Sequence, residues 1–250
     1  MSGHSHWATI KRKKGAGDAK RGQLFTKLAK EITLAARDGG DPDTNFRLRL
    51  AIDKARSNNM PKDSIDRALK RGTGESKDGA VFEEVMYEGY GPKGVALIIE
   101  CVTENRNRTV ADVRHALSRA GGNMGESGSV AWQFQRKAYF MLEECSMDFD
   151  SLFELVLDAG ADDIEQNDDG TIEIFAEVEN FKSISDALMK AGLHVAEAEL
   201  RYIPNQEMEL SKEDTLQVLR VVDALDEMDD TEHIFHNMAV SDDIYAEMEE

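Results

Sequence analysis

The sequence predicts an α+β protein in which an N-terminal three-helix bundle precedes two α/β domains. Apolar residues recur at helical spacing over the first 74 residues, whereas short β-branched runs alternate with helical stretches after residue 79. At 250 residues the chain also exceeds the usual size of one domain, so two or three compact units are expected.

The bundle consists of three short amphipathic helices. The first covers residues 18–37, with its basic residues on the face opposite the apolar stripe. Residues 41–43 open the second helix, and Pro61 begins the third, which Gly72 stops. We therefore expect a basic helical domain with a flexible N-terminal arm over residues 1–78.

The spacing of apolar residues changes after this domain. Residues 95–102 form an apolar, β-branched run typical of a buried strand, and residues 87–92 before it are typical of an edge strand and turn. A helical stripe over 110–117 and a strand over 128–134 follow. The order β-β-α-β leaves this unit without a second helix and a fourth strand.

The next stretch is complete by itself. Its order β-α-β-β-α-β is the split βαβ plan of ferredoxin-like folds, in which two helices cover one face of a four-stranded sheet. The helix and strand that follow it are what the preceding unit lacks, so we expect the complete stretch to be an insertion. The expected domains are 1–78, a discontinuous α/β domain of 79–135 plus 204–240, an inserted acidic α/β domain of 136–203, and a polar tail of 241–250.

Charge is sorted along the chain. Residues 1–74 carry 17 Lys and Arg against 8 Asp and Glu, whereas residues 136–250 carry 7 against 32. Lysine and arginine side chains that neutralise phosphates release condensed counterions, so the basic end predicts a polyanionic partner. The formal net charge of −19 hides this division.

The densest basic cluster lies near the N-terminus. Four adjacent cations at residues 11–14 repel one another when no anion is near, which favours an arm that orders on nucleic acid. A solvated terminus is the alternative. Trp7 either stacks on an unpaired base or anchors the arm to the bundle. The expected contacts in this region are Trp7, Lys11, Arg12, Lys13, Lys14, Lys20, Arg21, Lys27 and Lys30.

A second basic motif, NRNRT, occupies residues 105–109 between a predicted strand and a predicted helix. Arg106 and Arg108 flank a helix N-terminus, which itself favours anions, so a further phosphate contact is expected there. The alternative is structural: Asn107 or Thr109 caps the helix and an arginine forms a salt bridge with a neighbouring carboxylate.

The sequence shows no catalytic machinery. The six histidines and two cysteines have no metal-ligand spacing and form no nucleophile motif, and the glycine-rich segments match no phosphate-binding loop. We expect no enzymatic activity, no cofactor and no metal. Cys101 and Cys145 are expected to be ordinary half-buried thiols of a reducing compartment. No apolar run reaches the ~20 residues that a membrane helix needs.

Seven segments, taken in order, resemble the YebC family, which includes the mitochondrial translational activator of cytochrome oxidase. They are GHSHWATIK at 3–11, DAKR at 18–21, FTK at 25–27, SNNMPK at 57–62, YEGYGP at 87–92, NRNRT at 105–109, and GGN at 121–123 with GSV at 128–130. The resemblance implies a helical domain, two α/β domains and a regulator of gene expression without catalytic activity. It begins at residue 2, so we expect no transit peptide and a bacterial, cytoplasmic location. The positions to which it carries a nucleic-acid role are Lys11, Lys20, Arg21 and Lys27.

The leading hypothesis is a DNA-binding transcriptional regulator that contacts phosphates with its arm and basic helices. Asp63 and Asp66 on the third helix would repel the phosphates beside a DNA groove and disfavour direct contacts with base edges. Recognition of the shape or the backbone of the nucleic acid is therefore expected. A ribosome-associated translation factor is the alternative, with the basic end on rRNA or tRNA and the acidic part facing basic ribosomal proteins. A ligand-sensing or protein-interaction module is a further alternative and would need an apolar pocket between the α/β domains.

Overall fold

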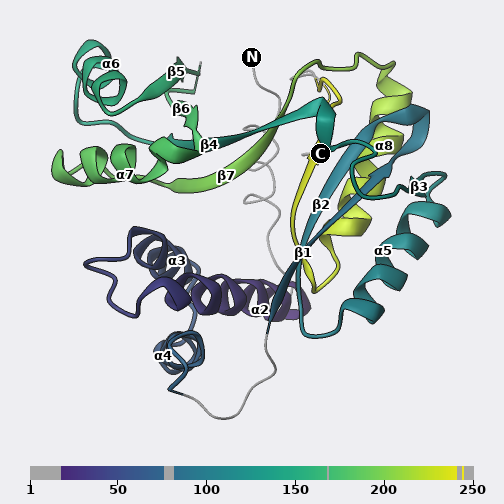
Figure 1. Cartoon of the computed structure of the whole chain (residues 1–250), viewed down its shortest axis with the longest axis horizontal. Helices are drawn as coiled ribbons and strands as arrows, with labels where there is room; N and C mark the ends of the chain where they lie inside the picture. Colours follow the sequence, from purple (N-terminus) through teal and green to yellow (C-terminus); the bar gives the residue numbers. More distant parts are fainter. Residues whose placement is uncertain (1–17, 76–81, 168, 241–243, 245–250) are drawn as a thin grey trace. The chain divides into compact units, whose positions relative to one another are not determined.

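The computed structural model describes residues 18–75, 82–167, 169–240 and 244, with side chains from Arg21 onward. The predicted α+β class is confirmed: N-terminal helices accompany two four-stranded sheets (Figure 1). The chain divides into two compact units. Unit 1 comprises residues 1–30, 78–135 and 203–250, and unit 2 comprises residues 31–77 and 136–202. The domain boundaries expected from the sequence stay a prediction.

The N-terminal helices are α2 (Asp18–Ala35), α3 (Phe46–Ser57) and α4 (Lys62–Gly72), and a short 3-10 turn, η1 (Ala36–Asp38), follows α2. The prediction that residues 41–43 open the second helix is wrong, because Asn45 caps it. The Asn45 side chain accepts a hydrogen bond from the Leu48 amide at 3.0 Å and donates to the carbonyls of Ala35 and Gly39. One amide side chain therefore joins the end of α2 to the start of α3.

Unit 1 contains an antiparallel sheet of order β3-β1-β2-β8. Helices α5 and α8 share one apolar core with it, where Leu97 and Ile99 meet Val113 of α5 and Val222 of α8. The last helix and strand of the chain thus complete a sheet that begins at residue 83. The elements are β1 (Glu83–Tyr90), β2 (Ala96–Thr103), α5 (Arg106–Arg119), β3 (Asn123–Met124), α8 (Lys212–Asp226) and β8 (Thr231–His236).

The strand predicted at an edge lies inside this sheet. β1 pairs with β2 along its whole length, with Tyr87 opposite Ile99, and it pairs with β3 at Gly89 and Tyr90. The prediction was wrong because β3 has only two residues and carries no periodic pattern that would reveal it.

Residues 128–134 do not form the predicted strand either. They contain a 3-10 turn, η3 (Ala131–Gln133), and β4 begins only at Phe134. The buried Glu88 carboxylate on β1 explains the difference, because it accepts hydrogen bonds from three backbone amides of this segment at 2.6, 2.7 and 2.8 Å. Amides that bind a carboxylate are not available to a neighbouring strand. The three donors are Gly128, Val130 and Ala131.

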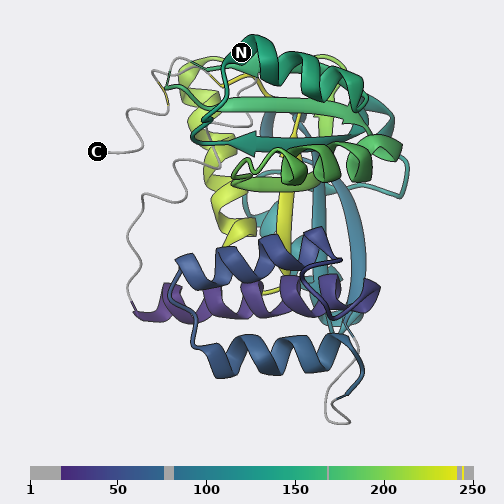
Figure 2. The ribbon, with the colours of Figure 1, turned by 90° about the vertical axis from the view of Figure 1, so that its left-hand side faces the viewer.

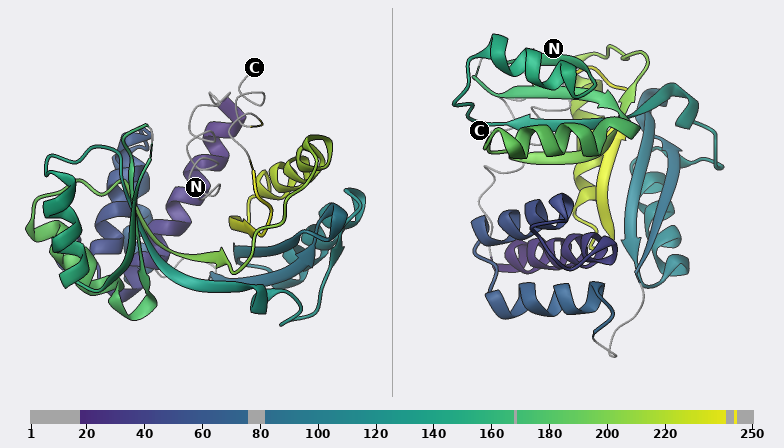
Figure 3. Two further views of the ribbon diagram at one scale, coloured as in Figure 1. Left: turned by 90° about the horizontal axis from the view of Figure 1, so that it is seen from above. Right: turned by 60° about the vertical axis from the view of Figure 1, so that its left-hand side comes forward.

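The second sheet has the order β5-β6-β4-β7, and the predicted split βαβ plan is confirmed. Figure 2 shows helices α6 and α7 in front of this sheet, and the view from above in Figure 3 shows both on the same side of it. The elements are β4 (Phe134–Leu142), α6 (Phe149–Asp158), β5 (Ala161–Gln166), β6 (Ile172–Glu177), α7 (Phe181–Lys190) and β7 (Glu197–Pro204).

The two faces of the second sheet differ in chemistry. Alternate residues such as Phe140 belong to the apolar core under α6 and α7. Arg201 points to the other face, where it pairs with Glu197 at 2.7 Å and Glu199 at 2.5 Å and lies 3.5 Å from the ring centroid of Tyr139. Unit 2 therefore balances its buried arginine with its own carboxylates.

Candidate nucleic-acid interface

Much of the predicted interface lies outside the described residues. Trp7, Lys11, Arg12, Lys13 and Lys14 fall there, and Lys20 lies in α2 without a described side chain. The structure places the remaining predicted contacts, all of them in unit 1: Arg21, Lys27, Lys30, Arg106 and Arg108.

The first half of α2 holds the segment that follows α8. Gln23 Nε2 donates to the carbonyl of Glu227 at 3.4 Å, and Lys27 Nζ donates to the carbonyl of Asp226 at 2.7 Å. Asp226 is the last residue of α8, where free carbonyls and the helix dipole favour a cation. Lys27 is therefore half-buried at a helix C-terminus, whereas Arg21 is exposed.

Lys30 is a buried residue, with 5 % of its surface exposed. Its ammonium group donates to the carbonyls of Val102 at 2.8 Å and Asp229 at 2.7 Å, and to the Asp230 carboxylate at 3.0 Å. An ammonium has three N–H donors, so unit 1 itself satisfies all of them.

The sequence places Lys27 and Lys30 on the face of the helix opposite its apolar stripe, and the structure shows that other parts of unit 1 cover this face at both residues. The acidic segment 226–230 packs against that side of α2 and neutralises it. The pattern within a helix shows where its apolar stripe lies, but it does not show which distant carboxylates will meet its polar side. We therefore leave both Lys27 and Lys30 out of the proposed interface.

Asp230 is the centre of a buried polar cluster. One of its carboxylate oxygens accepts hydrogen bonds from Arg108 and Thr109 at 2.7 Å each and from Thr103 at 3.1 Å. Burial raises the pKa of this carboxyl, but the hydrogen bonds from Arg108, Thr109 and Lys30 outweigh burial and lower the pKa to about 2. Asp230 therefore carries a charge at neutral pH.

The residues of the NRNRT motif have separate roles at the start of α5. Asn105 caps the helix by accepting a hydrogen bond from the Arg108 amide at 3.1 Å. The prediction that Asn107 or Thr109 is the cap is therefore wrong. Arg108 forms the salt bridge of the structural alternative, with 56 % of its side chain still exposed. Arg106 is exposed beside it.

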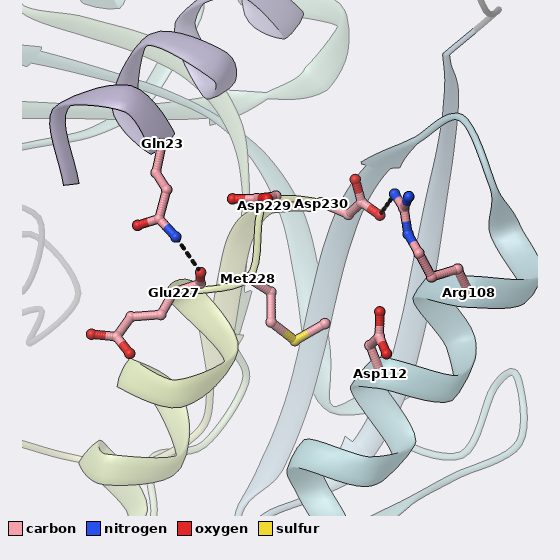
Figure 4. Close-up of a pocket in the computed structure, with 7 residues that line it drawn as sticks. All are labelled: Gln23, Arg108, Asp112, Glu227, Met228, Asp229 and Asp230. Atoms are coloured by element: carbon pink, nitrogen blue, oxygen red, sulfur yellow. Dashed lines mark hydrogen bonds and ion pairs between the residues drawn. The ribbon is translucent and has the colours of Figure 1, made fainter. Parts of the chain in front are cut away.

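A pocket of about 450 Å³ lies within unit 1 between α2, α5 and the segment after α8 (Figure 4). Four of its residues are carboxylates, and Arg108 already pairs with one of them. Such a lining repels phosphate groups and is not the apolar pocket that a ligand sensor would need. The lining residues are Gln23, Arg108, Asp112, Glu227, Met228, Asp229 and Asp230.

The outer face of α5 has the opposite character. The helix has four arginines and one histidine, and Asp112 is its single carboxylate. Arg106, Arg114, His115 and Arg119 are all exposed. This face can contact an anionic surface without competing for Asp230.

The cations of α3 in unit 2 are largely paired. Salt bridges join Lys54 to Glu31 at 3.1 Å and Arg56 to Asp53 at 3.3 Å. In the sequence, residues 31–77 carry ten Lys and Arg with eight Asp and Glu, whereas residues 1–30 carry eight with one. Seven of the nine excess positive charges of residues 1–77 thus lie in the first 30 residues.

The described residues offer little for metal or nucleophilic chemistry. In this part of the chain no group of three or more His, Cys, Asp or Glu side chains could hold a metal ion. Burial raises the pKa of the Cys101 thiol to about 12, which keeps it protonated and unreactive. Among the helices that the described residues form, none combines the length and apolar character needed to cross a membrane.

Comparison with known proteins decides the family. The family model for the TACO1/YebC N-terminal domain matches residues 5–75, and the model for the TACO1/YebC second and third domain matches residues 82–238. The chain belongs to the TACO1/YebC family. The resemblance seen in the sequence motifs is thereby confirmed.

Full-length relatives accompany these TACO1/YebC matches. A "Probable transcriptional regulatory protein" of Chlorobaculum tepidum is 51 % identical over 251 residues, and one of Idiomarina loihiensis is 48 % identical over 251 residues; both alignments cover 100 % of each chain. The crystal structure of a conserved hypothetical protein from Aquifex aeolicus aligns with a TM-score of 0.80 at 38 % identity, covering 95 % of this chain and 98 % of that one. It has the same fold.

The buried carboxylates Glu88 and Asp230, which organise unit 1 of this TACO1/YebC protein, were not predicted from the sequence. Asp230 belongs to an acidic segment in which nothing marks one carboxylate as buried. Glu88 belongs to the YEGYGP motif, and the edge position predicted for that motif would leave its carboxylate in water. A charged residue in a strand that proves to be internal requires buried donors.

Proposed function

We propose that the chain is a DNA-binding regulator of transcription of the YebC type, acting in the cytoplasm and without catalysis. The relatives named probable transcriptional regulatory proteins, 51 % and 48 % identical along the whole chain, support this assignment.

The single observation that carries the proposal is the concentration of unbalanced positive charge in residues 1–30. This segment contains eight Lys and Arg and one Asp. Two of the eight, Lys27 and Lys30, form salt bridges with the segment after α8, and the other six come before them in the sequence. These six have phosphates as their natural counter-charge. They are Lys11, Arg12, Lys13, Lys14, Lys20 and Arg21.

The outer face of α5 supplies a second phosphate contact in this proposal. Arg106 and the exposed part of Arg108 stand at the helix N-terminus, where backbone amides and the dipole also favour anions. Arg108 is held by Asp230, so its remaining N–H groups are positioned in advance.

Recognition is expected to depend on backbone and shape. α4 exposes Lys62, Arg67 and Lys70 together with Asp63, and a carboxylate among these cations opposes close approach to base edges. A sequence-independent affinity with strong salt dependence follows.

One observation favours a ribosomal site as the second candidate. Residues 138–181 contain 14 Asp and Glu and no Lys, Arg or His. A surface so acidic suits a setting in which basic proteins accompany nucleic acid, which the ribosome provides.

Equilibrium binding tests the proposal. Labelled duplex DNA, a ribosomal RNA fragment and tRNA are titrated with the protein at several salt concentrations, and anisotropy is recorded. We expect binding to DNA that weakens steeply with salt, and a loss of about 100-fold or more when Lys11, Lys13, Lys14 and Lys20 are changed to Glu. Thermal stability should barely change, because the apolar cores of both units are built from other residues.

The matched control changes Lys182, Lys190, Lys212 and Arg220 to Glu, which alters the net charge equally at exposed sites of α7 and α8. This variant should bind within about threefold of the native protein. Equal losses in the two variants would refute the role of the arm. Tighter binding to the RNAs than to DNA would refute the proposed role in transcription and favour the ribosomal site.

A further inference from the structure

Helix α6 carries a row of apolar side chains that its own unit buries only in part. Leu152 and Val156 face the core of the second sheet, whereas Phe153 and Leu157 are 42 % and 52 % exposed. Half-buried Phe149 precedes them by one turn, with its ring centroid 6.5 Å from that of Phe153. Because these three residues are spaced by four, they form one continuous row, here called the α6 ridge.

Carboxylates border the α6 ridge. Asp150, Glu154 and Asp158 repeat at the same spacing on the exposed side of the helix. The helix lies within residues 138–181, where the sequence has 14 Asp and Glu and no cation. No side chain of this segment can neutralise the border.

This combination restricts the kind of partner. Phosphate groups are repelled by the border, so nucleic acid is excluded as the occupant. A symmetric contact with a second copy of the chain would bring an equally acidic ridge against the first. A contiguous row of exposed apolar side chains marks an interaction site, and the acidic border favours positive charge on the partner.

We infer that the α6 ridge binds a basic, amphipathic helical segment of a partner protein. The two phenylalanines and the leucine supply apolar contact, and the three carboxylates pair with lysine or arginine at the edge of the contact. The α6 ridge belongs to unit 2 and the outer face of α5 belongs to unit 1. The protein can therefore bind a basic protein and nucleic acid through different parts of its chain.

The first test uses the full-length protein and a defined probe, a labelled 18-residue helical peptide with leucine on one face and lysine on the other. Binding is expected, and the double substitution Phe153→Ser with Leu157→Ser should weaken it about tenfold or more at both low and high salt. Glu154→Lys with Asp158→Lys should weaken it mainly at low salt, because screened charges matter less at high salt.

The matched control, Glu207→Lys with Glu209→Lys, makes the same charge change at exposed residues of unit 1 and should leave peptide binding unchanged. All variants should bind DNA like the native protein, which separates this inference from the proposed function. Unaltered peptide binding by both ridge variants, or equal binding of a lysine–glutamine peptide without leucine, would overturn the inference.

The second test places a photo-crosslinking phenylalanine analogue at position 153 in cells, with exposed position 183 on α7 as the control site. We expect a product specific to position 153 whose sequenced contact segment is basic and amphipathic, and whose yield falls about tenfold in the Glu154→Lys, Asp158→Lys background. Crosslinks to RNA, to a second copy of the chain, to its own residues 1–17, or to nothing would each contradict the inference.

Discussion

At the scale of single residues, buried polar groups organise unit 1 more than exposed cations do. Glu88 accepts three backbone amides, and Asp230 accepts four side-chain donors. A buried carboxylate needs such donors, because a buried charge without hydrogen-bond partners costs several kcal/mol. His236 is the opposite case, because it is buried without charge.

His236 makes stability depend on pH. It lies at the end of β8, where its Nδ1 accepts the Met238 amide at 3.3 Å, and burial lowers its pKa to about 4. Histidine in the unfolded chain has a pKa of about 6.5. Between pH 6.5 and pH 4 the unfolded chain binds a proton at this histidine and the folded protein does not. The stabilisation that depends on neutral His236 is therefore present above about pH 6.5 and is lost as the pH falls toward 4.

We expect the free energy of unfolding to fall by about 2 kcal/mol more between pH 7.5 and pH 5 in the native protein than in His236→Gln. Urea titrations at the two pH values measure this difference. His115→Gln, at an exposed position of α5, should keep the native dependence. Identical pH dependence in His236→Gln and the native protein would show that the buried imidazole does not govern it.

At the scale of elements, the Asp230 cluster joins parts of the chain that are far apart in sequence. Lys30 of α2, Thr103 of β2 and Arg108 of α5 all donate to one carboxylate. The helices themselves follow from local patterns, and α2, α5 and α8 occur where apolar spacing predicts them. Their polar contacts depend on tertiary structure.

Asp230→Asn tests the cluster. The amide keeps the shape but leaves the Lys30 ammonium buried without a counter-charge, so we expect a loss of about 3–5 kcal/mol in the free energy of unfolding. Denaturant titration at pH 7 measures it. Asp229→Asn is the matched control, because it changes an exposed carboxylate and keeps the carbonyl that Lys30 binds; it should cost less than about 0.5 kcal/mol. Equal effects of the two substitutions would refute the special role of Asp230.

At the scale of the whole molecule, the chain leaves unit 1 and returns to it through neighbouring strands. β4 and β7 lie side by side, and the Arg136 guanidinium is 5.7 Å from the ring centroid of Tyr202. Strand order thus favours the predicted insertion of residues 136–203, which remains to be tested by excision.

Replacing residues 137–201 with a short glycine–serine linker should leave the first sheet folded, because its core residues all lie outside the excised part. The measurement is an amide NMR spectrum, in which signals of β1, β2, β8 and α5 should keep their native positions. A second excision variant also carries Phe46→Ser and Leu50→Ser. Both residues pack against the core that is removed, so their exposed apolar side chains could otherwise cause aggregation. Loss of dispersed signals from the first sheet in this second variant would contradict the insertion.

The α+β class, most helices and strands, the split βαβ order and the division of charge follow from the amino-acid sequence alone, because periodicity and turn chemistry act over a few residues. Which cations are neutralised inside the protein depends on contacts that form when the chain folds. Lys30 and Asp230 are 200 residues apart, and no local pattern encodes which carboxylate of an acidic segment will meet a given lysine. The same reason explains the strand missed at β3 and the turn held by Glu88, since both depend on partners brought close by folding.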